Sequence, residues 1–129
     1  MDKPHKKLDA WNLVMDLVLR VYDLTDRFPR NEMYGLVDQM RRAAVSAPSN
    51  IAEGAARQTR KECVNFLHMA QGSLSEVDTL NDIAVRLKYV NNEEHHDLDV
   101  LMGRLGQTLS GLIRQPRSLL SRGRRDEKP

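Results

Sequence analysis

A short stretch of the chain concentrates five cationic side chains that suit phosphate binding. Between residues 41 and 61 these cations face a single carboxylate, that of Glu53; they are Arg41, Arg42, Arg57, Arg60 and Lys61. Clustered cations bind phosphates because neutralising the phosphates releases condensed counterions. We therefore predict a nucleic-acid-binding patch. The alternative is a solvated surface whose arginines form salt bridges with acidic parts of neighbouring subunits. No aromatic residue lies among these cations, so stacking of single-stranded bases is not expected.

A run of acidic residues and histidines is the best candidate for metal binding. The run Glu93-Glu94-His95-His96-Asp97 contains one E-x-x-H, the spacing of di-iron four-helix bundles. Those sites need two such motifs and two further carboxylates, all facing the middle of the bundle. Here the motif falls at the start of an expected helix, where the helix dipole already favours acidic residues. We predict no metal site.

The sequence supports nucleophilic or acid–base catalysis no better than it supports metal binding. Cys63 is the only cysteine, which excludes an internal disulfide, a Cys-based zinc site and a CxxC redox pair. It begins the apolar face of an expected helix, and no histidine in the pattern would activate it. No pattern brings Glu53 and Glu76 together around a cleft, and Glu53 more simply pairs with an arginine. The sequence predicts a non-enzymatic protein without a cofactor.

Helical periodicity defines the elements that position these residues. A first helix is predicted from about Asp9 to Arg27, ending before Pro29 because the residue before a proline is pushed out of the α region. Asn31 is the expected N-cap of a second helix, which Pro48 should kink by removing one backbone donor. Gly54 is the expected left-handed residue that ends this helix.

Two further helices follow at the same period. Thr59 and Glu62 fit a capping box at the start of the third, in which each side chain binds a free amide of the other residue. Asn91-Asn92 should break this helix and cap the fourth, which Pro116 ends. No segment alternates with period two. Long amphipathic helices with short connections predict an all-α fold, an antiparallel up-down-up-down four-helix bundle.

The first helix carries more apolar surface than its own bundle needs. Nine of the twelve residues from Leu13 to Leu24 are apolar. At 100° per residue they cover about 240° of the helix, whereas an outer helix of a bundle needs a stripe of just over ~100°. An exposed remainder of this kind usually marks a binding surface, and most soluble oligomers are closed homo-oligomers. We therefore predict self-association through Leu13, Val14, Leu17, Val18 and Val21.

Composition and charge place the chain among single-domain globular proteins. It has 129 residues, 40% hydrophobic and 29% charged, with a formal net charge of +2, which suits one domain. Residues 8–115 form the predicted bundle, whose body is acidic, between a basic arm at 1–7 and a basic tail at 116–129 expected to be disordered. We find neither a membrane-spanning run nor a signal-type segment, so a cytoplasmic location is expected.

Two stretches resemble a known family. Residues 39–54, QMRRAAVSAPSNIAEG, resemble the signature QxRRAAxSxPxNIAEG of the bacterial large-subunit (23S) rRNA intervening-sequence proteins, and residues 66–76, FLHMAQGSLSE, resemble its FLxxAxGSLxE stretch. The resemblance implies a four-helix bundle that assembles into a ring-like homopentamer. It also implies kinship with the accessory variability determinants of diversity-generating retroelements, which bind nucleic acid and a reverse transcriptase.

These observations lead to one functional prediction and one alternative. The prediction is a homo-oligomeric bundle protein that binds RNA, DNA or a nucleoprotein partner through basic patches repeated around the assembly. By family analogy, a reverse transcriptase is one candidate partner. The alternative is a protein-binding scaffold or adaptor with no role in nucleic-acid binding.

Overall fold

In the computed structural model, the described residues 3, 5 and 8–116 form four α-helices and one short 3-10 helix, with no strand. The elements are α1 (Asp9–Thr25), η2 (Arg30–Glu32), α2 (Leu36–Ala56), α3 (Arg60–Arg86) and α4 (Asn92–Arg114). The predicted all-α class is confirmed. The predicted disorder of the tail concerns residues 117–129, which lie outside the described part, as does most of the basic arm.

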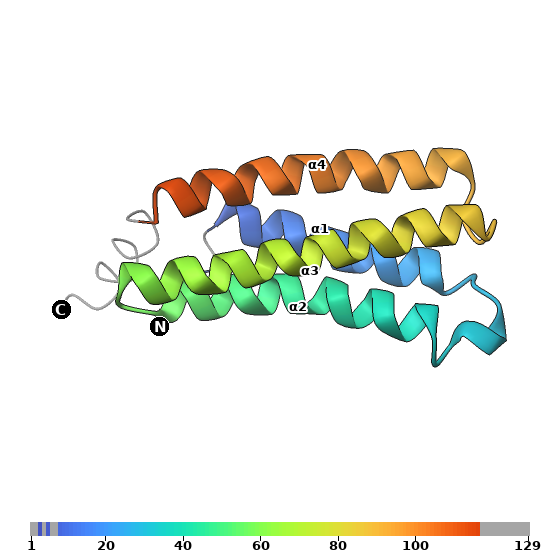
Figure 1. Cartoon of the computed structure of the whole chain (residues 1–129), viewed down its shortest axis with the longest axis horizontal. Helices are drawn as coiled ribbons and strands as arrows, with labels where there is room; N and C mark the ends of the chain where they lie inside the picture. The colour runs from blue at the N-terminus through green and yellow to red at the C-terminus, as the bar shows by residue number, and fades with distance from the viewer. Residues whose placement is uncertain (1–2, 4, 6–7, 117–129) are drawn as a thin grey trace.

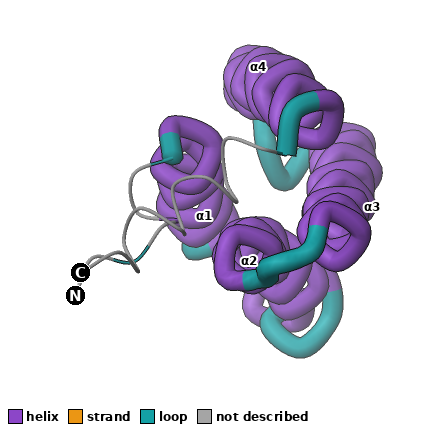
Figure 2. Tube along the Cα trace, turned by 90° about the vertical axis from the view of Figure 1, so that its left-hand side faces the viewer, coloured by secondary structure: helices purple, strands orange, loops and turns teal. Residues whose placement is uncertain are grey.

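The helices follow one another around the bundle in chain order (Figure 2). The connections from α1 to α2 and from α3 to α4 lie at one end of the molecule, and the α2–α3 connection lies at the other (Figure 1). Each helix therefore runs opposite to the one before it. None of the helices in the described chain is long and apolar enough to cross a membrane.

The connection between α1 and α2 differs from the prediction. The buried Thr25 hydroxyl donates to the Val21 carbonyl at 2.7 Å, and α1 ends there, two residues before the predicted Arg27. Asn31 does not cap α2, because it lies inside η2. The N-cap of α2 is Gly35, and the Glu32 carboxylate accepts a hydrogen bond from the Leu36 amide at 3.4 Å. An acid from the preceding turn thus replaces the expected cap.

Gly54 does not end α2, which continues to Ala56; no glycine among the described residues has a positive φ. A Cβ built on Gly54 would lie 3.2 Å from the Cys63 carbonyl oxygen and 3.2 Å from the Cβ of Phe66. Gly54 is therefore required for the close approach of α2 to α3, and its conformational freedom is not used. Pro48 lies inside α2; the kink expected there stays a prediction.

The two ends of α3 are fixed by different devices. At the start, the Thr59 hydroxyl oxygen accepts from the Glu62 amide at 3.2 Å, as predicted. At the end, the Tyr89 amide donates to the Ala84 carbonyl and the Lys88 amide to the Val85 carbonyl, the paired bonds of a Schellman motif. Lys88 takes the left-handed conformation with φ 65°, and α3 ends at Arg86, five residues before the predicted break at Asn91.

The start of α4 carries a complete capping box. The Asn91 side-chain oxygen accepts from the Glu94 amide at 2.8 Å, and the Glu94 carboxylate accepts from the Asn91 amide at 2.9 Å. Arg27 in the α1–α2 connection forms an ion pair with the same carboxylate. The box satisfies two free amides, and the ion pair ties α4 to the end of α1.

The core consists of the predicted apolar faces. Those of α2, α3 and α4 are buried at Met40, Ala47, Leu67, Leu98 and Leu105 among others. The contact between α2 and α3 is the most extensive and that between α1 and α4 the least. Small side chains explain the difference, because alanines and Gly54 let the backbones of α2 and α3 approach. A hydrogen bond of 2.8 Å from the Ser73 hydroxyl to the Ser46 hydroxyl joins the same pair.

Candidate functional site

The five predicted phosphate-binding cations fall into two separate groups. Arg41 and Arg42 lie in the first half of α2, whereas Arg57, Arg60 and Lys61 lie around the α2–α3 connection. The fifteen residues from Arg42 to Arg57 correspond to about 22 Å along a helix. The structure therefore does not bring the five cations together into one patch.

Arg41 contributes to the fold by joining α2 to the end of α1. Its Nε donates to the Thr25 hydroxyl at 2.9 Å, and its guanidinium carbon lies 4.4 Å from the centre of the Tyr22 ring. A further bond of 3.4 Å joins its Nη2 to the Tyr22 carbonyl. These partners lie in the last turn of α1, where a cation is favoured by the helix dipole and by the free carbonyls.

Arg42 remains available to solvent. Its Nε lies 2.9 Å from the Asp38 carboxylate, one turn back on α2, and its side chain is 80% exposed. An exposed pair of this spacing contributes only about 0.3–0.5 kcal/mol, so a stronger anion can displace Asp38.

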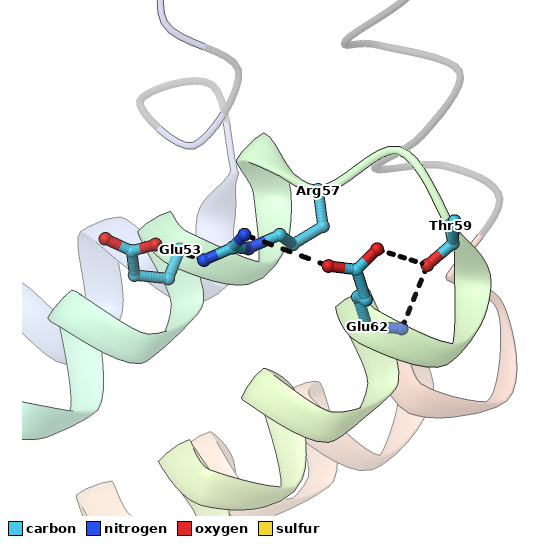
Figure 3. A network of polar contacts seen from close by, with 4 residues as sticks. All are labelled: Glu53, Arg57, Thr59 and Glu62. Atoms are coloured by element: carbon cyan, nitrogen blue, oxygen red, sulfur yellow. Dashed lines mark hydrogen bonds and ion pairs between the residues drawn. The ribbon is translucent and has the colours of Figure 1, made fainter.

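Arg57 lies at the centre of a polar network at the α2–α3 connection (Figure 3). Its guanidinium lies 3.1 Å from the Glu53 carboxylate and 3.8 Å from that of Glu62, and it stacks over the Phe66 ring at 4.8 Å. Its buried Nε has no hydrogen-bond partner among the described residues. Two carboxylates therefore offset the charge of Arg57, and Glu53 pairs with an arginine as expected.

The same network alters the predicted capping box. The Glu62 carboxylate accepts from the Thr59 hydroxyl at 2.9 Å, in place of the Thr59 amide that the reciprocal box would use. Only the half of the box that caps α3 is formed at this helix, because the Glu62 carboxylate faces the Thr59 hydroxyl and Arg57.

Arg60 and Lys61 are the exposed part of the basic set. They are the first two residues of α3. Cations are unfavourable at the positive end of a helix dipole, so their position does not stabilise α3. Together with the positive end of the helix dipole, they make this corner of the bundle attractive to anions.

The chemistry of Cys63 and the histidines argues against a reactive site. Burial raises the pKa of the Cys63 thiol, which keeps it protonated and unreactive. His95 Nε2 lies 2.7 Å from the Asp82 carboxylate, and the Glu94 carboxylate is used by its capping box. Over the described residues, no group of three or more histidine, cysteine and acidic side chains is placed to hold a metal ion.

The predicted oligomer interface needs correction. Val14, Leu17 and Val21 are 0% exposed because they form part of the chain's own core. Leu13 and Val18 are half-buried against that core. The apolar side chains of α1 that the bundle covers only in part or leaves exposed lie on another face, which we call the outer stripe of α1: Met15, Val18, Leu19 and Tyr22. Leu19 is 67% and Tyr22 42% exposed.

A groove that the sequence reasoning did not identify lies between α3 and α4. It has a volume of about 850 Å³ and is lined by apolar and polar groups from both helices. We call it the α3–α4 groove. Gly103 and Gly106 line it, and a Cβ on either would meet no atom within 4 Å. These glycines inside a helix were the sequence signal that could have indicated the groove.

The fold defines a small all-α protein of the four-helix type, with exposed cations at the α2–α3 connection. Residues 6–111 match the family described as 23S rRNA-intervening sequence protein. The chain belongs to this family. A similar solved structure is a protein of unknown function from the S23 ribosomal protein family of Bacteroides thetaiotaomicron, with a TM-score of 0.74, 20% identity, and coverage of 82% of this chain and 99% of that one. No curated protein matches the chain.

Proposed function

We propose that this protein is a homo-oligomeric, non-enzymatic bundle that binds nucleic acid or a nucleoprotein partner through the corner formed by Arg57, Arg60 and Lys61. The exposed pair Arg60 and Lys61 carries the proposal, because two cations at the positive end of α3 do not stabilise that helix. We therefore assign Arg60 and Lys61 a role in binding a partner. Phosphate groups are the anions that clustered cations bind well.

Oligomerisation makes this small corner effective. One copy offers three cations, of which Arg57 is already paired with Glu53 and Glu62, so a single corner binds weakly. In a ring-like pentamer, the assembly that the family resemblance implies, the corner repeats around the axis and avidity multiplies weak contacts. The outer stripe of α1, including the exposed Leu19 and Tyr22, is the contact surface we assign to this assembly.

Charge neutralisation at the corner tests the proposal. In a gel-shift titration with labelled duplex RNA and DNA of mixed sequence, the double variant Arg60→Gln/Lys61→Gln should bind about tenfold more weakly at low salt and with a shallower salt dependence. The double variant Arg20→Gln/Arg104→Gln removes the same charge from exposed positions on α1 and α4 and should bind nearly as the wild type does. Equal losses in both variants, or no shift of wild type at low salt, would contradict the proposal.

A protein-binding scaffold is the second candidate function, and the connection between η2 and α2 favours it. Tyr34 is 92% and Met33 52% exposed there, and exposed aromatic and methionine side chains are enriched in protein interfaces. Capture of one specific protein that survives nuclease treatment would support this function over the first.

A further inference from the structure

The chemical character of the residues that line the α3–α4 groove changes along its length. Starting from Arg114, the last residue of α4, the lining passes the open backbone at Gly106 and then reaches the apolar side chains of Met102 and Leu74. The carboxylates of Asp99 and Asp78 lie beyond them. At 1.5 Å per residue, Met102 is about 18 Å and Asp99 about 22 Å from Arg114 along α4.

The acidic part of the groove lacks a neutralising cation in the described chain. Burial raises the pKa of Asp78, as do the carboxylates of Asp82 and Asp99 and a hydrogen bond with Asp99, while His95 opposes the shift. His95 itself is engaged with Asp82. Negative charge therefore accumulates on this side of the bundle, and a cation placed between Asp78 and Asp99 would relieve it.

The segment that follows α4 in the sequence carries apolar residues and then basic residues, the order that complements the apolar and acidic parts of the groove. Leu119-Leu120 is followed by Arg122-Gly123-Arg124-Arg125. An extended chain covers about 3.3 Å per residue, so Leu120 can reach about 20 Å from Arg114, and Arg122 to Arg125 about 26–36 Å. After a reversal at Pro116 the extended chain returns along α4 for about 13 Å to Leu120 and for about 20–30 Å to Arg122 and Arg125. The leucines therefore reach the level of Gly106, and the arginines pass that of Met102 and reach that of Asp99.

We propose that the α3–α4 groove is a binding site for the chain's own basic tail. Leu119-Leu120 packs beside Gly106 against Leu74, and the arginines from Arg122 onward pair with Asp78 and Asp99. The missing side chains of Gly103 and Gly106, with no atom near their Cβ positions, leave room for the tail to approach the backbone of α4. Docking of the tail withholds its arginines from other anionic partners. The inference does not depend on the proposed nucleic-acid binding.

Disulfide trapping in the full chain tests the placement. In a Cys63→Ala background, Leu120→Cys is combined with Gly106→Cys in the groove or, as a control, with Gly72→Cys on α3. Neither glycine has an atom within 4 Å of its Cβ position, and Gly72 does not line the groove, so both tolerate the cysteine. We expect an intramolecular disulfide with Gly106→Cys to form faster than with Gly72→Cys. An intermolecular disulfide places a second copy's tail in the groove and overturns the proposal, as do equal rates for the two pairs.

Tryptic cleavage tests the charge pairing without new cysteines. The double variant Asp78→Asn/Asp99→Asn should be cut at Arg122 about fivefold faster than wild type, since losing two rim ion pairs frees the tail. Asp16→Asn/Asp23→Asn removes two exposed carboxylates from α1 and should leave the rate unchanged. Equal cleavage of wild type and the groove variant would overturn the proposal, and so would a foreign basic peptide occupying the groove without being excluded by the tail.

Discussion

At the scale of single residues, Glu94 shows how a local cap becomes a tertiary contact. Its carboxylate accepts from the Asn91 amide, closing the capping box, and also pairs with Arg27 of the α1–α2 connection, which lies at the same end of the molecule. The hydrogen bond from Asn91 and then the interaction with Arg27 lower the pKa of Glu94. A lowered pKa means that the folded state favours the ionised form, so Glu94 stabilises the fold only while it is charged.

The pH dependence of unfolding should report this residue. Because the folded-state pKa of Glu94 is depressed, its contribution is present above the unfolded value of about 4.3 and is lost as the pH falls further, through the folded value. The urea midpoint of the wild type should decline over that range. Glu94→Gln keeps a capping-box side chain but should show a flatter decline.

Glu93→Gln is the matched control, since Glu93 lies in the same turn but outside the box. It should follow the wild-type profile. A decline in Glu94→Gln that is identical to that of the wild type would show that this carboxylate does not couple folding to pH.

At the scale of elements, the contact between α2 and α3 depends on a missing side chain. Gly54 is buried inside α2, against the backbone of Cys63 and the Cβ of Phe66. Gly72 on α3 is exposed, and a Cβ there would meet no atom within 4 Å. Two glycines in adjacent helices therefore have opposite roles.

Alanine substitution should separate these roles. Gly54→Ala should lower the free energy of unfolding by about 1–2 kcal/mol, because the new Cβ forces the two helices apart. Gly72→Ala should raise it by about 0.5–1 kcal/mol, because alanine loses less conformational entropy in a helix. Denaturant unfolding of both variants measures the two signs. A stabilised Gly54→Ala would show that the close approach does not constrain α2.

At the scale of the whole molecule, α1 presents a stripe of apolar side chains that the bundle does not fully cover. The bundle covers Val14, Leu17 and Val21 completely but leaves Leu19 and Tyr22 exposed. Met15 and Val18 lie on the same stripe, at the helical spacing of three and four residues. A contiguous stripe of this kind fits contact between copies of the chain.

Sedimentation should show whether the outer stripe of α1 holds the assembly together. At micromolar concentration the wild type should sediment as an oligomer, and Leu19→Glu should shift it toward the 14.8 kDa chain, because a charge at an apolar interface is costly. Val100→Glu alters a residue of comparable exposure on α4, 50% against 67%, and should not shift the distribution. A wild type that sediments as a monomer would contradict the assembly and the repeated basic corner that depends on it.

The sequence by itself determined the features that local chemistry controls. The 3.6-residue period fixed four helices and most of their buried faces, because apolar side chains must share one side of each helix. Thr59 and Asn91 were readable as caps because an N-cap bonds an amide only two or three residues ahead. The sequence motifs also indicated the family to which the chain belongs.

Tertiary structure decided what depends on residues distant in the chain. Which apolar side of α1 faces inward follows from the positions of its neighbouring helices, so the predicted interface residues Val14, Leu17 and Val21 turned out to be core. The sequence predicted that Gly54 ends a helix, but the structure shows that it makes room for α3. The sequence also predicted that Arg41 binds a ligand, but in the structure Arg41 binds the end of α1. The α3–α4 groove lies between two consecutive helices, but the residues that face each other across it, such as Gln71 and Ser110, are distant in the chain. No periodicity within either helix records the space between them.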